Sequence, residues 1–164
     1  MAWVGSTITT QVVNLLTGPE GLGASLATLM EAEKSSLAQV GPLQILAQNV
    51  SADIAERSTD VTYPAVYVYC EKIVNQLTEK FRIFSGKAVM VVEVRVSQDR
   101  LDGLEALAQS YVDAVTQVLD QSRGNWNEGM YYAGGYEVAF GAVKHGGRNL
   151  MQTAKVTFEV GVSN

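Results

Sequence analysis

The clearest strand signal in the chain is Ala88–Ser97, with the sequence AVMVVEVRVS. Apolar side chains occupy its even positions throughout, whereas its odd positions change from valine to Glu93, Arg95 and Ser97. Because successive side chains of a strand point to opposite faces of a sheet, this pattern predicts one face that is buried over the whole strand. The other face is expected to be covered only at its start.

Three other segments alternate in the same way. Ala65–Tyr69 follows Tyr63-Pro64, and a proline disfavours helix at the residue before it. Tyr136–Ala142 and Ala154–Val162 are separated by the glycine-containing segment Lys144–Asn149. Since a hairpin needs only local pairing, these two segments predict a C-terminal β-hairpin. A shorter run, Leu43–Ala47 after Gly41-Pro42, predicts a brief additional strand.

One long helix is predicted between the strands, from about residue 100 to 121. Asp99 is its expected N-cap and Gly124 its expected end. Its apolar positions form one stripe, which consists of Leu101, Leu104, Leu107, Ala108, Tyr111, Val115, Val118 and Leu119. Its polar side is acidic, with Asp102, Glu105, Asp113 and Asp120, and no basic residue lies between Leu101 and Ser122.

The first 58 residues have a different pattern. Helical spacing of apolar residues predicts one helix that ends at Gly18-Pro19 and a second one around Leu22–Met30. Residues 51–58 fit either an extended piece or a helical turn. The prediction is an α+β fold, in which an antiparallel or mixed sheet is flanked by helices and the long helix packs on the sheet. Residues 1–58 form a helical segment of the same domain or a small extension, and residues 59–164 form the α+β core.

Composition and motifs argue against an enzyme. The single histidine, His145, lies in a glycine-rich turn, and the single cysteine, Cys70, ends an alternating strand. One histidine and one cysteine cannot supply the four ligands of a structural zinc site, and no glycine cluster has the lysine-serine ending of a phosphate loop. We therefore expect no catalytic residue, no metal and no cofactor. The net charge of −5 also disfavours non-specific DNA binding, and no segment is long and apolar enough to cross a membrane.

The candidate functional surface has two parts. The loop from Gly124 to Tyr132 contains an unusual number of large side chains, which are Trp126, Met130, Tyr131 and Tyr132. It is interpreted either as a contact patch or as a loop that folds back so that Trp126 caps the core. The C-terminal hairpin carries the second part, which is basic, whereas the long helix is acidic. The candidate residues of the hairpin are Lys144, His145, Arg148 and Lys155. These oppositely charged regions either pair between neighbouring subunits or are two separate solvated faces.

The last predicted strand provides a further interface hypothesis. It runs to Val162 without a proline and carries only Lys155 and Glu159 as charges on its outer face. If it formed a sheet edge, its unpaired backbone groups would favour pairing with another chain.

Several elements of residues 60–164 occur in a recognisable order. They are the strand entry Tyr63-Pro64-Ala65-Val66-Tyr67-Val68, the strand Val89–Val96, the helix Leu101–Leu119, the loop with Trp126, and the strands Tyr136–Ala142 and Ala154–Val162. In this order they resemble the tail terminator (tail completion) proteins of tailed bacteriophages. The N-terminal helical segment is longer than a minimal member of that family needs.

The resemblance implies a structural virion protein of the neck, which is assembled in the host cytoplasm. It implies a homo-hexameric ring that caps the tail tube, stops its polymerisation and joins the tail to the head. The implied partners are further copies of the chain, the tail tube protein, the head–tail connector or stopper protein and, in contractile tails, the sheath protein. DNA would pass through the lumen without specific binding.

Three other interpretations remain. One is another neck component, such as a head-completion or stopper protein. The second is a small cytosolic ligand-binding or enzymatic domain, for which a polar pocket that contains His145 would be evidence. The third is a tail-tube subunit, which would polymerise without limit and would contain less helix.

Overall fold

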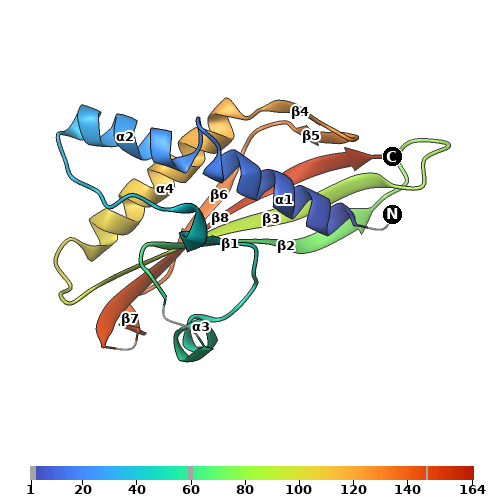
Figure 1. Cartoon of the computed structure of the whole chain (residues 1–164). Helices are drawn as coiled ribbons and strands as arrows, with labels where there is room; N and C mark the ends of the chain where they lie inside the picture. Colours follow the sequence, from blue (N-terminus) through green and yellow to red (C-terminus); the bar gives the residue numbers. More distant parts are fainter. Residues whose placement is uncertain (1–2, 59–60, 147) are drawn as a thin grey trace.

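The computed structural model describes residues 3–58, 61–146 and 148–164 and has an α+β fold. A curled mixed sheet forms one layer, and helices lie along it (Figure 1). The helices are α1 (Val4–Thr17), α2 (Leu22–Glu33), α3 (Ala52–Ser58) and α4 (Leu104–Gln121). The strands are β1 (Ile45–Leu46), β2 (Ala65–Asn75), β3 (Ser85–Gln98), β4 (Gly124–Asn127), β5 (Met130–Tyr132), β6 (Glu137–Phe140), β7 (Lys144–Gly146) and β8 (Asn149–Ser163).

The centre of the sheet consists of three long antiparallel strands in the order β2-β3-β8. Val92 of β3 pairs with Val68 of β2 and with Val156 of β8, and all three side chains are fully buried. This row lies on the even-numbered face of β3, which the alternation in the sequence predicts to be buried. That prediction is confirmed.

Helices α1, α2 and α4 bury their apolar stripes against this face. Ile8, Val12 and Leu16 of α1 recur at helical spacing and are almost completely buried. The Tyr111 hydroxyl of α4 donates a hydrogen bond of 2.6 Å to the carbonyl of Ala38 and so holds the segment after α2 against α4. The N-terminal helices thus share one hydrophobic core with the sheet. Residues 59 and 60, where the predicted boundary between the two segments falls, lie outside the described residues.

The long helix begins later than the sequence pattern predicts. Its N-cap is Gly103, at a positive φ of 80°, rather than Asp99, and Leu101 is 64% exposed instead of joining the apolar stripe. A left-handed backbone is readily adopted by glycine, which explains why the first turn starts after Gly103. The helix ends at Gln121, and Gly124 opens β4 rather than ending the helix.

The last strand is internal and not an edge. One side of β8 pairs with β3 over its length, and the other side pairs in turn with β7, β6 and β5. The C-terminal hairpin is present as β6 and β7 against β8, with an interruption at residues 141–143. Residue 147 of the predicted turn lies outside the described residues. The hypothesis that β8 offers a free edge to another chain is therefore wrong, because three short strands satisfy its outer backbone groups.

Two shorter predictions are also settled. The brief strand predicted at 43–47 is present as the two-residue β1, and a 3-10 turn at Pro42–Gln44 takes the place of its first residues. Residues 51–58, for which the sequence allows two conformations, contain the helix α3. Figure 1 shows α3 on the side of the sheet away from α1, α2 and α4.

Candidate functional site

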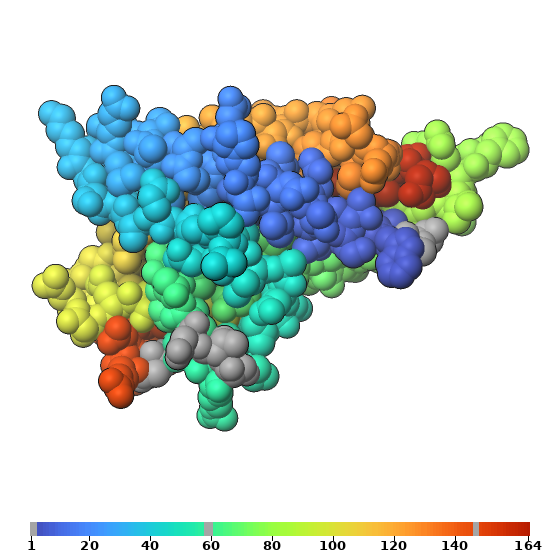
Figure 2. All heavy atoms as spheres, viewed as in Figure 1, coloured from blue at the N-terminus to red at the C-terminus, as the bar shows by residue number. Residues whose placement is uncertain are grey.

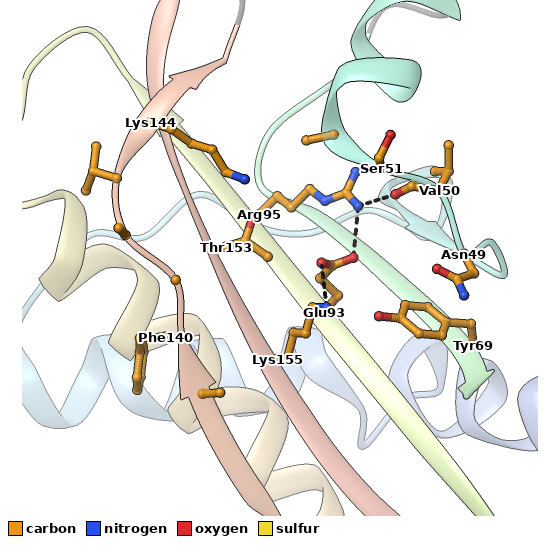
Figure 3. A pocket seen from close by; sticks show the side chains of 15 residues that line it. Asn49, Val50, Ser51, Tyr69, Glu93, Arg95, Phe140, Lys144, Thr153 and Lys155 are labelled. Atoms are coloured by element: carbon orange, nitrogen blue, oxygen red, sulfur yellow. Dashed lines mark hydrogen bonds and ion pairs between the residues drawn. The ribbon is translucent and has the colours of Figure 1, made fainter. Parts of the chain in front are cut away.

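A groove of about 660 Å³ lies on the sheet face opposite the large helices. Its floor is formed by odd-numbered residues of the central strands, including Tyr69, Glu93 and Arg95 (Figure 3). The segment 49–52 at the start of α3 forms one wall, and the segment 139–144, from the end of β6 to the start of β7, forms another.

An ion pair is buried in the floor of this groove. Arg95 Nη2 lies 2.8 Å from Glu93 Oε2, and the two side chains are only 3% and 9% exposed. The same Nη2 donates a hydrogen bond to the carbonyl of Val50, so Arg95 ties β3 to the segment before α3. The sequence pattern predicts this part of β3 to be uncovered, which is wrong. Tyr67, which lies against the Arg95 guanidinium, belongs to a second small buried cluster with Ala65 and Ala55 on this face.

Arg95 has donors without a hydrogen-bond partner among the described residues. Its guanidinium carbon lies 4.1 Å from the centre of the Tyr67 ring, in a cation–π arrangement. Within the described part of the chain, its Nε and Nη1 atoms are buried and have no hydrogen-bond partner. Buried donors without partners are costly, so part of the Arg95 charge remains uncompensated beneath the groove.

Two lysines add positive charge at the rim. Lys155 Nζ lies 4.0 Å from Glu93 Oε1, and the Lys155 side chain is half exposed. Lys144 is exposed and extends toward Arg95 from the opposite wall (Figure 3). The described residues that line the groove include three basic side chains and one acidic one, Glu93. The groove therefore has a local positive excess in a chain whose net charge is −5.

Tyr69 is a neutral polar group of the groove floor. Its burial, together with the nearby charges of Glu93 and Glu71, raises the pKa of its hydroxyl to about 12. The phenol therefore remains protonated at neutral pH and has a proton to donate.

The predicted contact loop is a β-hairpin, β4–β5, whose large side chains point mostly inward. Trp126 is 6% exposed, and its Nε1–H donates a hydrogen bond of 2.7 Å to the carbonyl of Ser122. Tyr132 is fully buried between Trp126 and Phe158, with ring centres 5.4 Å from each. Met130 is also buried. Of the two interpretations that the sequence allows, the one in which Trp126 caps the core describes the structure.

The other candidate surface residues are exposed. Tyr131 is 54% exposed on the outer side of β5. Lys144 and Lys155 meet at the groove, whereas His145 and Arg148 are exposed at the β7–β8 turn and do not line it. The structure thus brings together two of the four basic residues and adds Arg95, which the sequence pattern assigns only to a strand.

An ordered projecting segment was not identifiable from the sequence pattern. The connection between β2 and β3 (residues 76–84) extends beyond the body of the molecule (Figure 2). It exposes three large apolar side chains, with Leu77 at 61%, Phe81 at 104% and Ile83 at 75%. In the sequence, the arrangement of apolar residues in Phe81-Arg82-Ile83-Phe84 does not distinguish an exposed projection from a buried turn.

Hydrogen bonds hold this segment, which we call the β2–β3 arm, in place. Ser85 Oγ accepts a hydrogen bond from the backbone N–H of Glu79, and Ser163 Oγ donates one to the Glu79 carboxylate. Leu77 and Phe81 have positive φ values of 49° and 66°. Such a backbone is unfavourable for large side chains and tends to occur where a functional constraint maintains it.

Neither the cysteine nor the histidine lies in an environment typical of a catalytic residue. Cys70 is half-buried on β2, where burial raises the pKa of its thiol and so disfavours the reactive thiolate. His145 is exposed on β7. In the described residues, no group of three or more histidine, cysteine or acidic side chains is arranged to hold a metal ion. The described helices include none with the length and apolarity of a membrane span.

Comparisons of the sequence with protein-family models and with curated proteins gave no match.

Proposed function

We propose that the chain is a structural subunit that forms a closed hexameric ring, caps a phage tail tube, stops its polymerisation and provides the head–tail joining surface. The resemblance to tail terminator proteins is the reason for proposing this particular assembly, a ring on a tail tube. The observation that supports self-assembly most directly is the β2–β3 arm, an ordered projection that exposes Leu77, Phe81 and Ile83.

The arm favours a protein partner for a physical reason. Exposed apolar side chains that cluster on one feature mark contact sites, whereas singly scattered ones need no explanation. Trp3, which is 78% exposed, lines a pocket with Asn164, and Asn164 is hydrogen-bonded to Phe84 at the base of the arm. Burial of a large apolar side chain at an interface contributes about 1.5–3 kcal/mol, so a few such residues per contact are enough to matter in a ring.

The decisive measurement is the solution mass by light scattering, across a concentration series and with and without purified tail tubes. We expect a closed mass near six protomers, either in free solution or on tube ends. A single chain that ignores tail tubes at every concentration would contradict the proposal. Open-ended growth would instead indicate a tube subunit.

The arm can be tested separately from the body. The variant L77S/F81S/I83S should remain folded and lose assembly, because it removes only exposed apolar groups. The matched control is L43S/L101S, which changes two leucines that are 91% and 64% exposed outside the arm. Equal assembly of the arm variant and the control would show that the arm makes no contact.

A further inference from the structure

We propose that the groove around Arg95 receives acidic side chains from the outer face of helix α4 of a second copy of this chain. The inference rests on the proposed function, because it names two surfaces that meet between neighbouring ring subunits in addition to the β2–β3 arm. Nothing in the resemblance specifies these surfaces; the argument comes from burial, charge and the position of the two faces.

The groove has a surplus of positive charge in a single chain. Arg95 is buried, yet its Nε and Nη1 atoms have no partner among the described residues. The negative charge of Glu93 balances one of the three positive charges, so Arg95, Lys144 and Lys155 together leave a positive excess. A carboxylate is an acceptor of suitable charge for lysine and arginine donors, and such charge-assisted hydrogen bonds are the strong ones.

Helix α4 presents the complementary chemistry. Glu105, Asp113 and Asp120 are exposed, and α4 contains no basic residue. At 3.6 residues per turn these three carboxylates lie within an arc of about 80° on one side of the helix. Asp120 pairs with Arg123 at 3.3 Å, but in the described chain neither Glu105 nor Asp113 forms an ion pair. Two carboxylates are thus available for an external partner.

The two surfaces cannot meet within one molecule. Helix α4 packs on the face of the sheet that carries Val92, whereas the groove lies on the face that carries Glu93. When complementary patches lie on opposite faces, they pair head to tail between copies. A head-to-tail contact closes into a ring when the rotation between successive subunits is suitable. The arrangement therefore fits a ring better than a two-fold dimer.

A charge-reversal pair tests the contact. The groove variant is K144E/K155E, and the helix variant is E105K/D113K; all four positions are exposed or half exposed, so both variants should fold. Alone, each variant places like charges against each other and should lose the closed mass in favour of the single chain. An equimolar mixture should recover the closed mass, because alternating copies restore opposite charges at every contact.

The control is K34E/K72E, which reverses two exposed lysines outside the groove and should assemble as the wild-type chain does. The readout is light-scattering mass, or co-sedimentation with tail tubes where assembly requires them, and circular dichroism checks that each variant is folded. Wild-type mass in both variants would overturn this inference while the ring proposal stands. Loss in each variant without recovery in the mixture would also overturn it.

Two further outcomes are informative. A wild-type chain that stays single with and without tail tubes would overturn both the ring and the contact. Labelled duplex DNA that binds the wild-type chain and not K144E/K155E would overturn the acidic helix as the occupant and would assign the groove to phosphate instead.

Discussion

Arg95 and Glu93 lie two residues apart on the same face of β3 and form a buried ion pair of 2.8 Å. The hydrogen bond from Arg95 to the carbonyl of Val50 links the pair to the segment before α3. One interaction therefore contributes both to the packing of the second sheet face and to the charge of the groove.

Replacement of Glu93 by glutamine should destabilise the protein by about 3–5 kcal/mol, because it leaves the Arg95 charge buried without a counter-charge. The measurement is the free energy of unfolding from urea denaturation. The control is E159Q, which breaks the exposed Lys87–Glu159 pair of 2.6 Å and should cost less than about 1 kcal/mol. Equal effects of the two substitutions would contradict the burial of the Glu93–Arg95 pair.

The double variant V156D/F158D should not fold. Both side chains lie on the helix-covered face of β8, at 0% and 2% exposure, and an unpaired buried carboxylate costs several kcal/mol. Two such changes approach or exceed the ~5–15 kcal/mol stability of a typical domain. The control E159D introduces the same residue on the exposed side of the strand. A folded V156D/F158D variant, by circular dichroism, would show that the strand register is wrong.

Trp126 should behave as a core residue. W126A removes its packing on Tyr132 and its hydrogen bond to Ser122, so we expect a loss of about 3–5 kcal/mol in thermal or chemical unfolding. Y131A, on the exposed side of the same hairpin, should change stability by less than about 1 kcal/mol. A larger loss of stability in Y131A than in W126A would contradict the placement of Trp126 in the core and of Tyr131 on the surface.

Stability should fall in strongly alkaline solution. Burial and the nearby Asp120 raise the pKa of Tyr132 to about 12 in the folded chain, from its ordinary value of 10.0. Because the unfolded chain releases this proton at lower pH than the folded chain, the contribution is complete below pH 10 and is lost as pH rises toward 12. Unfolding curves across this range measure the slope. The Y132F variant should show a shallower decline, and an unchanged slope would contradict the assignment.

The local elements were largely predictable from the sequence, because they depend on periodicity. Alternation over Ala88–Ser97 and Ala154–Val162 predicts two strands that the structure contains as β3 and β8. Helical spacing predicts α1, α2 and most of α4. The start of α4 differs because a left-handed glycine, Gly103, rather than the side-chain pattern determines where the helix begins, whereas its end at Gln121 agrees with the prediction.

The site was less predictable. Lys144 and Lys155 were candidates from their charge alone, but Arg95 was not, since its position in the strand pattern suggested solvent exposure. Arg95 contacts the Tyr67 ring and the carbonyl of Val50, which lie far from it in the sequence. The periodicity of apolar residues within a strand does not indicate such a long-range contact.

The sequence by itself determined the strand and helix periodicity, the face of the central strands that is buried under the helices, and the separation of acidic and basic segments. Only the tertiary structure decided that β8 is internal, that Trp126 points into the core, and that Glu93 and Arg95 are buried at a groove. The physical reason is that periodicity shows how the apolar and polar side chains of one segment are distributed between its two faces. Which other segment covers each face depends on long-range packing of the whole chain.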